Sequence, residues 1–101
     1  MYLADDKTIY IQRGLVYQDM GNHQYAIQDF EKAIELDQNY SLSHFHLGVS
    51  KLKSRLVREA TEDFKRSMQT EENPNSLDGL GQCYHMMGNF ELAIDHFEQA
   101  I

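Results

Sequence analysis

The sequence predicts an all-α protein built from about three stacked pairs of antiparallel helices, six helices in all. One observation is that apolar residues such as Ala26, Phe30 and Ala33 recur at intervals of three and four, which places them on one stripe of a helix. A second is the weakness of strand signals, because the chain has one proline and no alternation of Val, Ile and Thr. A third is that GNHQYAIQDFEKAI at residues 21–34 returns as GNFELAIDHFEQAI at residues 88–101.

The repeated stretch belongs to a longer period. A third copy, RLVREATEDFKRSM, lies between the other two at residues 55–68. Three residue types mark the same spacing of 34 and then 33 residues. They are the alanines Ala26, Ala60 and Ala93, the phenylalanines Phe30, Phe64 and Phe97, and the glycines Gly14, Gly48 and Gly81. A period of this length indicates stacked supersecondary units.

Each unit is predicted to hold two helices. We expect them at about residues 7–19 and 23–37, then 41–53 and 57–70, then 75–87 and 90–101. Asp5 or Asp6 is the expected N-cap of the first helix, because its side chain accepts hydrogen bonds from free N–H groups. Gly21 ends this helix, since glycine tolerates left-handed backbone. Asn73 and Pro74 are expected to begin the fifth helix as N-cap and first helical residue.

The turn inside the second unit is expected to differ from the other two. Gly21 and Gly88 occupy this turn in units one and three, whereas the second unit has Arg55. A residue other than glycine there either bears the strain of left-handed backbone or changes the shape of the turn. We therefore expect this hairpin to be the least regular of the three.

The marker residues suit close helix packing. The glycines and alanines are small where two helices cross at an axial distance of about 8–10 Å. The phenylalanines fill the volume between those crossings. We interpret the whole stripe as core packing.

The period and its markers resemble the tetratricopeptide repeat (TPR), whose pattern is Trp-x2-Leu-Gly-x2-Tyr, then Ala-x3-Phe, then Ala and Pro. Unit one matches through Tyr10, Gly14, Tyr17, Ala26, Phe30 and Ala33 and departs at Arg13 and Gln38. Unit three matches through Leu77, Leu80, Gly81, Tyr84, Ala93, Phe97 and Ala100. Unit two keeps Leu47, Gly48, Ala60 and Phe64 but departs at His44, Lys51 and Ser67. The resemblance covers nearly the whole chain and implies a right-handed superhelical solenoid with units at about residues 7–40, 41–73 and 74–101.

Charge and composition disfavour several classes of function. The formal net charge is -7, whereas nucleic acids and anionic membranes attract clustered Lys and Arg. No run of about 18 apolar residues occurs, and residues 1–8 lack the regions of a signal peptide. The single cysteine, Cys83, forms no internal disulfide and fits a reducing compartment. We therefore expect a cytoplasmic protein.

No motif predicts catalysis, a cofactor or a metal. GLGQCY at residues 79–84 begins like a dinucleotide fingerprint but has Tyr84 in place of the third glycine. Cys83 and His85 are two positions apart and so point to different sides of a helix. No two histidines have the i, i+4 spacing that places two metal ligands on one helical face. We predict that the chain is no enzyme and binds neither cofactor nor metal.

The resemblance implies a concave groove lined by the first helix of each pair. Register with the family gives nine candidate partner-binding residues, which are Ile11, Leu15, Gln18, Phe45, His46, Val49, Leu52, Gln82 and His85. The same register also places on the groove side Thr8, Gln12, Asp19, Leu42, Lys53, Asn75, Asp78, Gly79 and Met86. The apolar members of the first and second units form a strip, and an exposed apolar strip marks a partner site. The alternative is that another segment of the same protein covers the strip.

One class of partner is not expected. Some TPR proteins clamp the acidic C-terminal tails of heat-shock chaperones with Lys, Arg and Asn side chains. The corresponding positions here hold Ile11, Leu15, His46, Asn75 and Gly79. Because the cations that would pair with carboxylates are absent there, we predict that acidic chaperone tails are not partners.

Three functions remain, in order of preference. The first is a non-catalytic module that binds an extended or helical protein segment in the apolar groove. The second is a structural scaffold of a larger assembly that contacts partners, or copies of itself, through its ends. It is favoured by the helix that finishes at Ile101, whose apolar side a following helix would normally cover, so we expect a fragment of a longer array that self-associates through this helix. The third, an enzyme or a regulatory piece of one, has no support.

Overall fold

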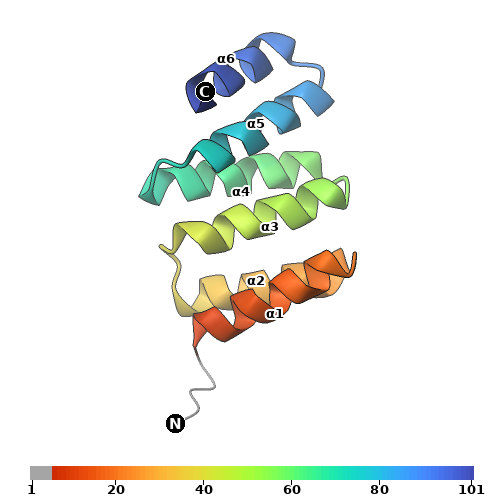
Figure 1. Ribbon diagram of the computed structural model, residues 1–101, viewed down its shortest axis with the longest axis vertical. Coiled ribbons are helices and arrows are strands. Elements are labelled where there is room, and N and C mark those ends of the chain that lie inside the picture. The colour runs from red at the N-terminus through yellow and green to blue at the C-terminus, as the bar shows by residue number, and fades with distance from the viewer. Residues whose placement is uncertain (1–5) are drawn as a thin grey trace.

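The computed structural model, which describes residues 6–101, is a stack of six helices (Figure 1). The helices are α1 (Lys7–Asp19), α2 (His23–Leu36), α3 (Ser41–Lys53), α4 (Val57–Thr70), α5 (Pro74–Met86) and α6 (Phe90–Ala100). Every helix begins and ends within one residue of the predicted position, and no strand occurs in the described part of the chain. The all-α class and the three helix pairs are therefore confirmed.

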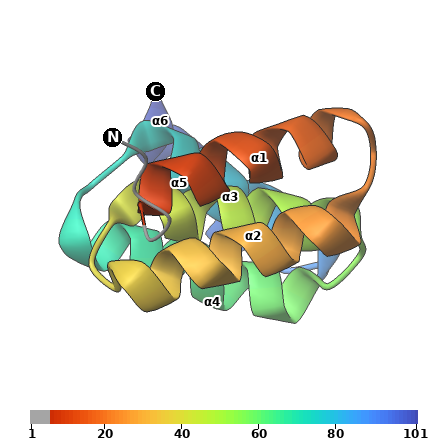
Figure 2. The same cartoon turned by 90° about the horizontal axis from the view of Figure 1, so that it is seen from below.

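The helices are arranged as a solenoid rather than as a bundle around one core. The molecule measures 49 × 26 × 19 Å, and each helix packs on the helices before and after it in the chain. Seen along the stack, α1, α3 and α5 lie on one side, and α2 and α4 lie on the other (Figure 2). The backbone of α3 also approaches α1 and α5, whereas within the described residues α2 and α4 do not approach each other. The side formed by α1, α3 and α5 is therefore the inner, concave side.

The predicted glycine–phenylalanine crossings are confirmed. A Cβ atom on Gly14 would lie 2.7 Å from Cε1 of Phe30, and one on Gly48 would lie 2.9 Å from Cε1 of Phe64. Both phenylalanine rings are buried, as is Ala26, which lies beside Phe30 in the first core cluster. Any larger residue at these glycines would push the two helices of a pair apart.

Each of the two core clusters crosses a junction between units. Leu47 of α3 joins the cluster around Phe30, and Leu80 of α5 joins the cluster around Phe64. Three serine hydroxyls also form a chain of hydrogen bonds near the second junction, which is the junction between units two and three. Ser67 Oγ lies 3.0 Å from Ser41 Oγ and 2.8 Å from Ser76 Oγ, all three side chains being buried. The departure from the family pattern at Ser67 therefore provides one hydrogen bond within unit two, to Ser41, and one between units two and three, to Ser76.

The turn inside the second unit is more regular than expected. Arg55 has a φ of 70°, close to the 80° of Gly21 and the 79° of Gly88. The Leu56 N–H donates to the Lys51 carbonyl at 2.8 Å, and the corresponding bonds in the other two turns have the same length. The expectation of the least regular hairpin is therefore wrong, and the alternative holds: Arg55 bears left-handed strain because the hydrogen bonds keep the turn shape.

The predicted helix starts are also confirmed where they lie in the described residues. Asp6 accepts a 2.8 Å hydrogen bond from the Thr8 N–H as the N-cap of α1, whereas Asp5 lies outside the described residues. Asn73 accepts one of 2.8 Å from the Asn75 N–H, with Pro74 in the first turn of α5. These local contacts set the start of both inner helices.

Candidate partner-binding groove

A hollow of about 300 Å³ lies on the inner side, between α3 and α5. Its α3 wall is apolar and its α5 wall is polar. Phe45, Val49 and Leu52 form the first wall, and Asn75, Asp78 and Gln82 belong to the second. The α3 side chains are half-buried, because they also pack on the core cluster around Phe64. The hollow therefore offers an apolar surface beside a row of hydrogen-bonding groups.

One glycine lines the hollow at a position where the preceding unit has an aromatic ring. His46 in α3 and Gly79 in α5 are 33 residues apart and occupy the same position in successive units. At the first junction, the His46 ring stacks on Phe30 with ring centroids 5.6 Å apart. At the second junction, a Cβ on Gly79 would lie 2.6 Å from Cζ of Phe64. The glycine lets α5 lie close to Phe64, and the lack of a side chain leaves open the space beside it.

The two ends of the hollow carry opposite charges. Asp78 corresponds by the repeat to Phe45, which lies eight residues before Lys53 on α3. At a rise of about 1.5 Å per residue, the two charged positions are about 12 Å apart along the helix direction. The Gln82 side chain donates a 2.9 Å hydrogen bond to Asp78. Lys53 lines the hollow at its other end, beside Met86.

Four of the nine predicted groove residues line the hollow: Phe45, Val49, Leu52 and Gln82. Ile11 does not, because it is only 9% exposed and belongs to the core cluster around Phe30. Leu15 is half-buried and packs on the same cluster. The expected continuous apolar strip from the first unit to the second is therefore wrong at Ile11, since stacking of the second unit covers it.

The other predicted residues have different surroundings. Gln18 donates a 2.8 Å hydrogen bond to Ser50 Oγ across the first junction. His46 is half-buried there, and burial lowers its pKa below the ordinary value for histidine. His85 is exposed, and its ring lies 5.9 Å from that of Phe90. Gln18 and His46 therefore stabilise the first junction.

Register had placed Asn75, Asp78, Gly79 and Met86 on the groove side, and all four line the hollow. Phe64, at its base, was assigned to the core alone. No sequence signal marks a core ring as the floor of a hollow, because that depends on the helix that faces it.

Two ionisable groups outside the lining of the hollow have raised pKa values. Burial raises the pKa of the Cys83 thiol, which lowers the fraction of the side chain present as the reactive thiolate. Burial also raises the pKa of Asp63, although Lys51 Nζ lies 3.0 Å away and opposes the shift. Among residues 6–101, no three His, Cys, Asp or Glu side chains are grouped so that they could hold a metal ion. The same residues include no helix long and apolar enough to cross a bilayer.

The stack and its inner hollow define a helical-repeat protein. Two family models, both described as tetratricopeptide repeat, match residues 8–40 and residues 74–101. The chain therefore belongs to the tetratricopeptide repeat family. Members of this family typically act as non-enzymatic protein-interaction modules.

Two curated relatives show how much of a longer protein the chain matches. It is 24% identical over 92 residues to TPR repeat-containing protein MJ0940 of Methanocaldococcus jannaschii, covering 91% of this chain and 29% of that protein. It is 33% identical over 72 residues to DnaJ homolog subfamily C member 3 of Gallus gallus, covering 71% of this chain and 14% of that protein. The chain thus spans less than a third of the length of either relative.

Solved structures agree with the fold. A crystal structure of MamA superposes with a TM-score of 0.91 at 22% identity, covering 96% of this chain and 57% of that one. The second TPR of Spaghetti (RPAP3), bound to the HSP90 peptide SRMEEVD, gives a TM-score of 0.91 at 19% identity. This superposition covers 94% of this chain and 89% of the other. At these identities the likeness concerns the fold alone.

Proposed function

We propose that this chain is a non-catalytic protein–protein interaction module that binds a partner segment in the hollow between α3 and α5. The observation that carries the proposal is the apolar wall of Phe45, Val49 and Leu52 on the concave side, which packs on the core cluster around Phe64 and also lines the open hollow. Apolar surface that is gathered in a hollow marks an interaction site more strongly than single exposed residues do. Family membership supports an interaction role in general.

The hollow by itself provides modest affinity. Fully burying two large apolar side chains such as Phe45 and Leu52 is worth about 3–6 kcal/mol. Both are already half-buried, so a partner gains only part of this energy while still losing translational and rotational freedom. We therefore expect a partner segment that also contacts the polar wall on α5.

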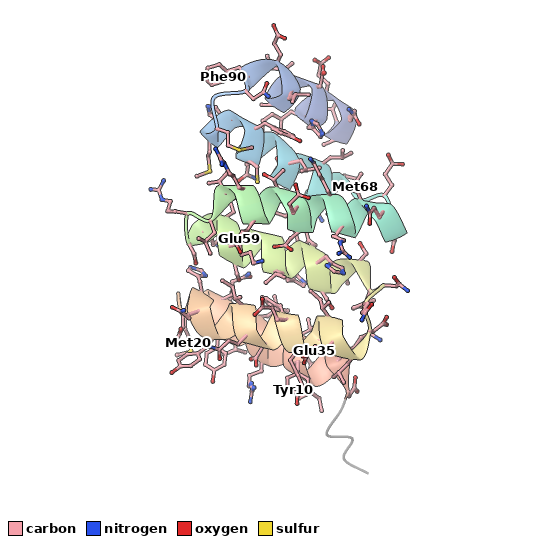
Figure 3. The ribbon with its side chains drawn as sticks, turned by 180° about the vertical axis from the view of Figure 1, so that it is seen from behind. Tyr10, Met20, Glu35, Glu59, Met68 and Phe90 are labelled. Atoms are coloured by element: carbon pink, nitrogen blue, oxygen red, sulfur yellow. The ribbon has the colours of Figure 1, made fainter. Side chains whose placement is uncertain are left out.

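A pair of methionines allows a matched test. Met86 lines the hollow at the end of α5, whereas Met20 directly follows the last residue of α1, near the opposite end of the stack from Phe90 (Figure 3). Both side chains are exposed, so glutamate at either position should leave the fold intact. With a partner isolated from extract and then purified, Met86→Glu should raise the Kd by about tenfold or more, and Met20→Glu by less than about twofold. Unchanged partner binding by a folded Met86→Glu variant would falsify the groove.

Acidic chaperone tails remain outside the proposed partners. The positions that would have to supply cations hold Ile11, Leu15, His46, Asn75 and Gly79, none of which is Lys or Arg. Titration of the chain with the peptide SRMEEVD tests this exclusion directly. We expect no saturable binding up to about 1 mM peptide, and a Kd near 10 μM or below would overturn it.

A second candidate function is a scaffold that works through its C-terminal end. Phe97 is only half-buried, whereas the equivalent Phe30 and Phe64 are 0% and 1% exposed, and Ile94 on the same helix is exposed. We propose this face as a contact for a larger assembly or for a longer array. Sedimentation velocity at increasing concentration tests self-association: wild type should associate and Ile94→Glu should not. A strictly monomeric wild type at about 1 mM contradicts self-association through α6.

A further inference from the structure

The hollow between α3 and α5 corresponds to a place that the chain fills with its own side chain one unit earlier. His46 occupies that place at the first junction and stacks on Phe30 at an interplanar angle of 25°. The same ring also meets Phe45 edge-on, with centroids 5.3 Å apart. The repeat therefore shows which kind of group this position accommodates: a flat ring between the inner helices.

At the second junction the ring is missing and its neighbours remain. Gly79 stands at the position of His46, and the base of the hollow is again the ring of a core phenylalanine, Phe64. Phe45 lies against it, with ring centroids 5.9 Å apart. Aromatic rings are attracted to such clusters by edge-to-face and offset contacts beyond the area that they bury.

The size and the rim of the hollow limit what binds there. A volume of about 300 Å³ is at the small end of ligand pockets and suits a single side chain better than a long acyl chain. Asn75, Asp78 and Gln82 stand on successive turns of α5 along one edge. Their amides and carboxylate can bond the main-chain N–H and C=O groups that flank a side chain in a polypeptide.

We infer that the hollow is a socket for one aromatic side chain of the partner segment, and that this ring takes the place at Gly79 that the imidazole of His46 takes in the unit before. The inference rests on the proposed function and specifies the anchor of the partner. The anchor is uncharged, because its surroundings are Phe45, Val49, Leu52 and Phe64. Asp78 and Lys53, at opposite ends of the hollow, meet the polypeptide on either side of it.

Two small amides test the socket without knowledge of the partner. N-acetyl-phenylalanine amide and N-acetyl-alanine amide are each titrated into the whole chain, and backbone NMR shifts are followed. The phenylalanine amide should shift residues around Val49, Leu52, Gly79 and Met86, with an affinity at least about tenfold above that of the alanine amide. Equal affinities, or shifts centred elsewhere, overturn the socket.

Variants that close or open the position make the test specific. Gln82→Phe places a ring at the rim and should weaken the phenylalanine amide by about tenfold, whereas Gln28→Phe, on an exposed site of α2, should not change it. His46→Ala removes the resident ring and should open a second site for the same amide beside Phe30. If His46→Ala is too unstable for titration, Gln82→Phe and Gln28→Phe still decide the question. Equal affinity of these two variants for the phenylalanine amide would contradict the socket.

The outcomes separate the socket from the proposed function. If the amide binds in the hollow and Gln82→Phe blocks it, while the partner binds Met86→Glu as tightly as wild type, the socket stands and the proposed function fails. If partner binding requires Met86 but the phenylalanine amide does not bind in the hollow, the proposed partner-binding groove stands and the inference of an aromatic anchor is wrong.

Discussion

The junction between α2 and α3 and the junction between α4 and α5 are built from equivalent positions, yet on the inner side the first is occupied by a ring of the chain itself and the second holds a hollow. The first has the His46 ring on Phe30 where the second has Gly79. The Gln18–Ser50 hydrogen bond of the first junction is also replaced, since its equivalents, Leu52 and Cys83, belong to or pack on the apolar core cluster around Phe64. The repeat thus builds the same stack twice, and residues outside its marker pattern decide whether the inner side of a junction is occupied or open.

The largest expected effect comes from removing the two core rings. Phe30→Ala and Phe64→Ala should each destabilise the protein by about 3–5 kcal/mol, because both rings are fully buried. We expect Phe64→Ala to cost the smaller amount, because its space joins the open hollow instead of leaving an enclosed cavity. Urea denaturation measures both. An equal or larger loss for Phe64→Ala would mean that the second junction is packed as tightly as the first.

The next effect tests the close approach at Gly79. Replacing a helical glycine by alanine ordinarily stabilises a helix by about 0.5–1 kcal/mol. Here the added Cβ would meet the Phe64 ring at 2.6 Å, so Gly79→Ala should instead destabilise by about 1–3 kcal/mol. Asn75→Ala, at an exposed position on the same helix, is the control and should change stability little. A stabilising Gly79→Ala would contradict the close approach.

A smaller, pH-dependent effect is expected at the first junction alone. Burial lowers the pKa of His46, so the folded state favours the neutral ring, and protonation favours the unfolded state. Stability from this group is present above the unfolded pKa of about 6.5 and declines as the pH falls below it. Between pH 7 and pH 5, wild type should therefore lose more stability than His46→Gln.

The control for this pH experiment is His85→Gln, because His85 is exposed. It should keep the wild-type pH dependence. Asp63, whose pKa is raised by burial, acts in the opposite direction but is present in all three proteins. If the urea midpoint changed with pH by the same amount in wild type and in His46→Gln, the stacked ring would titrate as in water.

The smallest effect concerns the turn that joins α3 to α4. Arg55 has a φ of 70°, a conformation that glycine adopts without strain. Arg55→Gly should therefore stabilise the protein by roughly 0.5–1 kcal/mol, the relief of strain being partly offset by the greater freedom of glycine when unfolded. Thermal unfolding measures the change. A loss of stability instead would indicate that the arginine side chain makes contacts outweighing the strain.

Much of the fold could be predicted because its signals are local or repeated. Asp6 and Asn73 mark helix starts through hydrogen bonds to N–H groups two residues away. The glycine–phenylalanine pairs recur with the period, so each copy supports the others. The misjudged turn at Arg55 was also local, but its shape is held by hydrogen bonds from N–H groups of the turn to carbonyls at the end of α3.

The candidate groove was predictable only in part. Register identified the residues on the inner face, including Phe45, Val49 and Gly79. It could not distinguish Ile11 from Phe45, which occupy the same position in successive units, although the first is in the core and the second lines the hollow. The difference comes from the residues that the next unit brings against each of them.

The sequence by itself determined the helices, their pairing and their stacking, because spacing along the chain decides which side chains share a helical face and which small residues recur at crossings. Only the tertiary structure decided where the stack is open. Open volume depends on two helices from neighbouring units and on the side chain between them. His46 in one unit corresponds to Gly79 in the next, and this replacement of an imidazole by a hydrogen can be related to an open space only once the position of α5 against Phe64 is known.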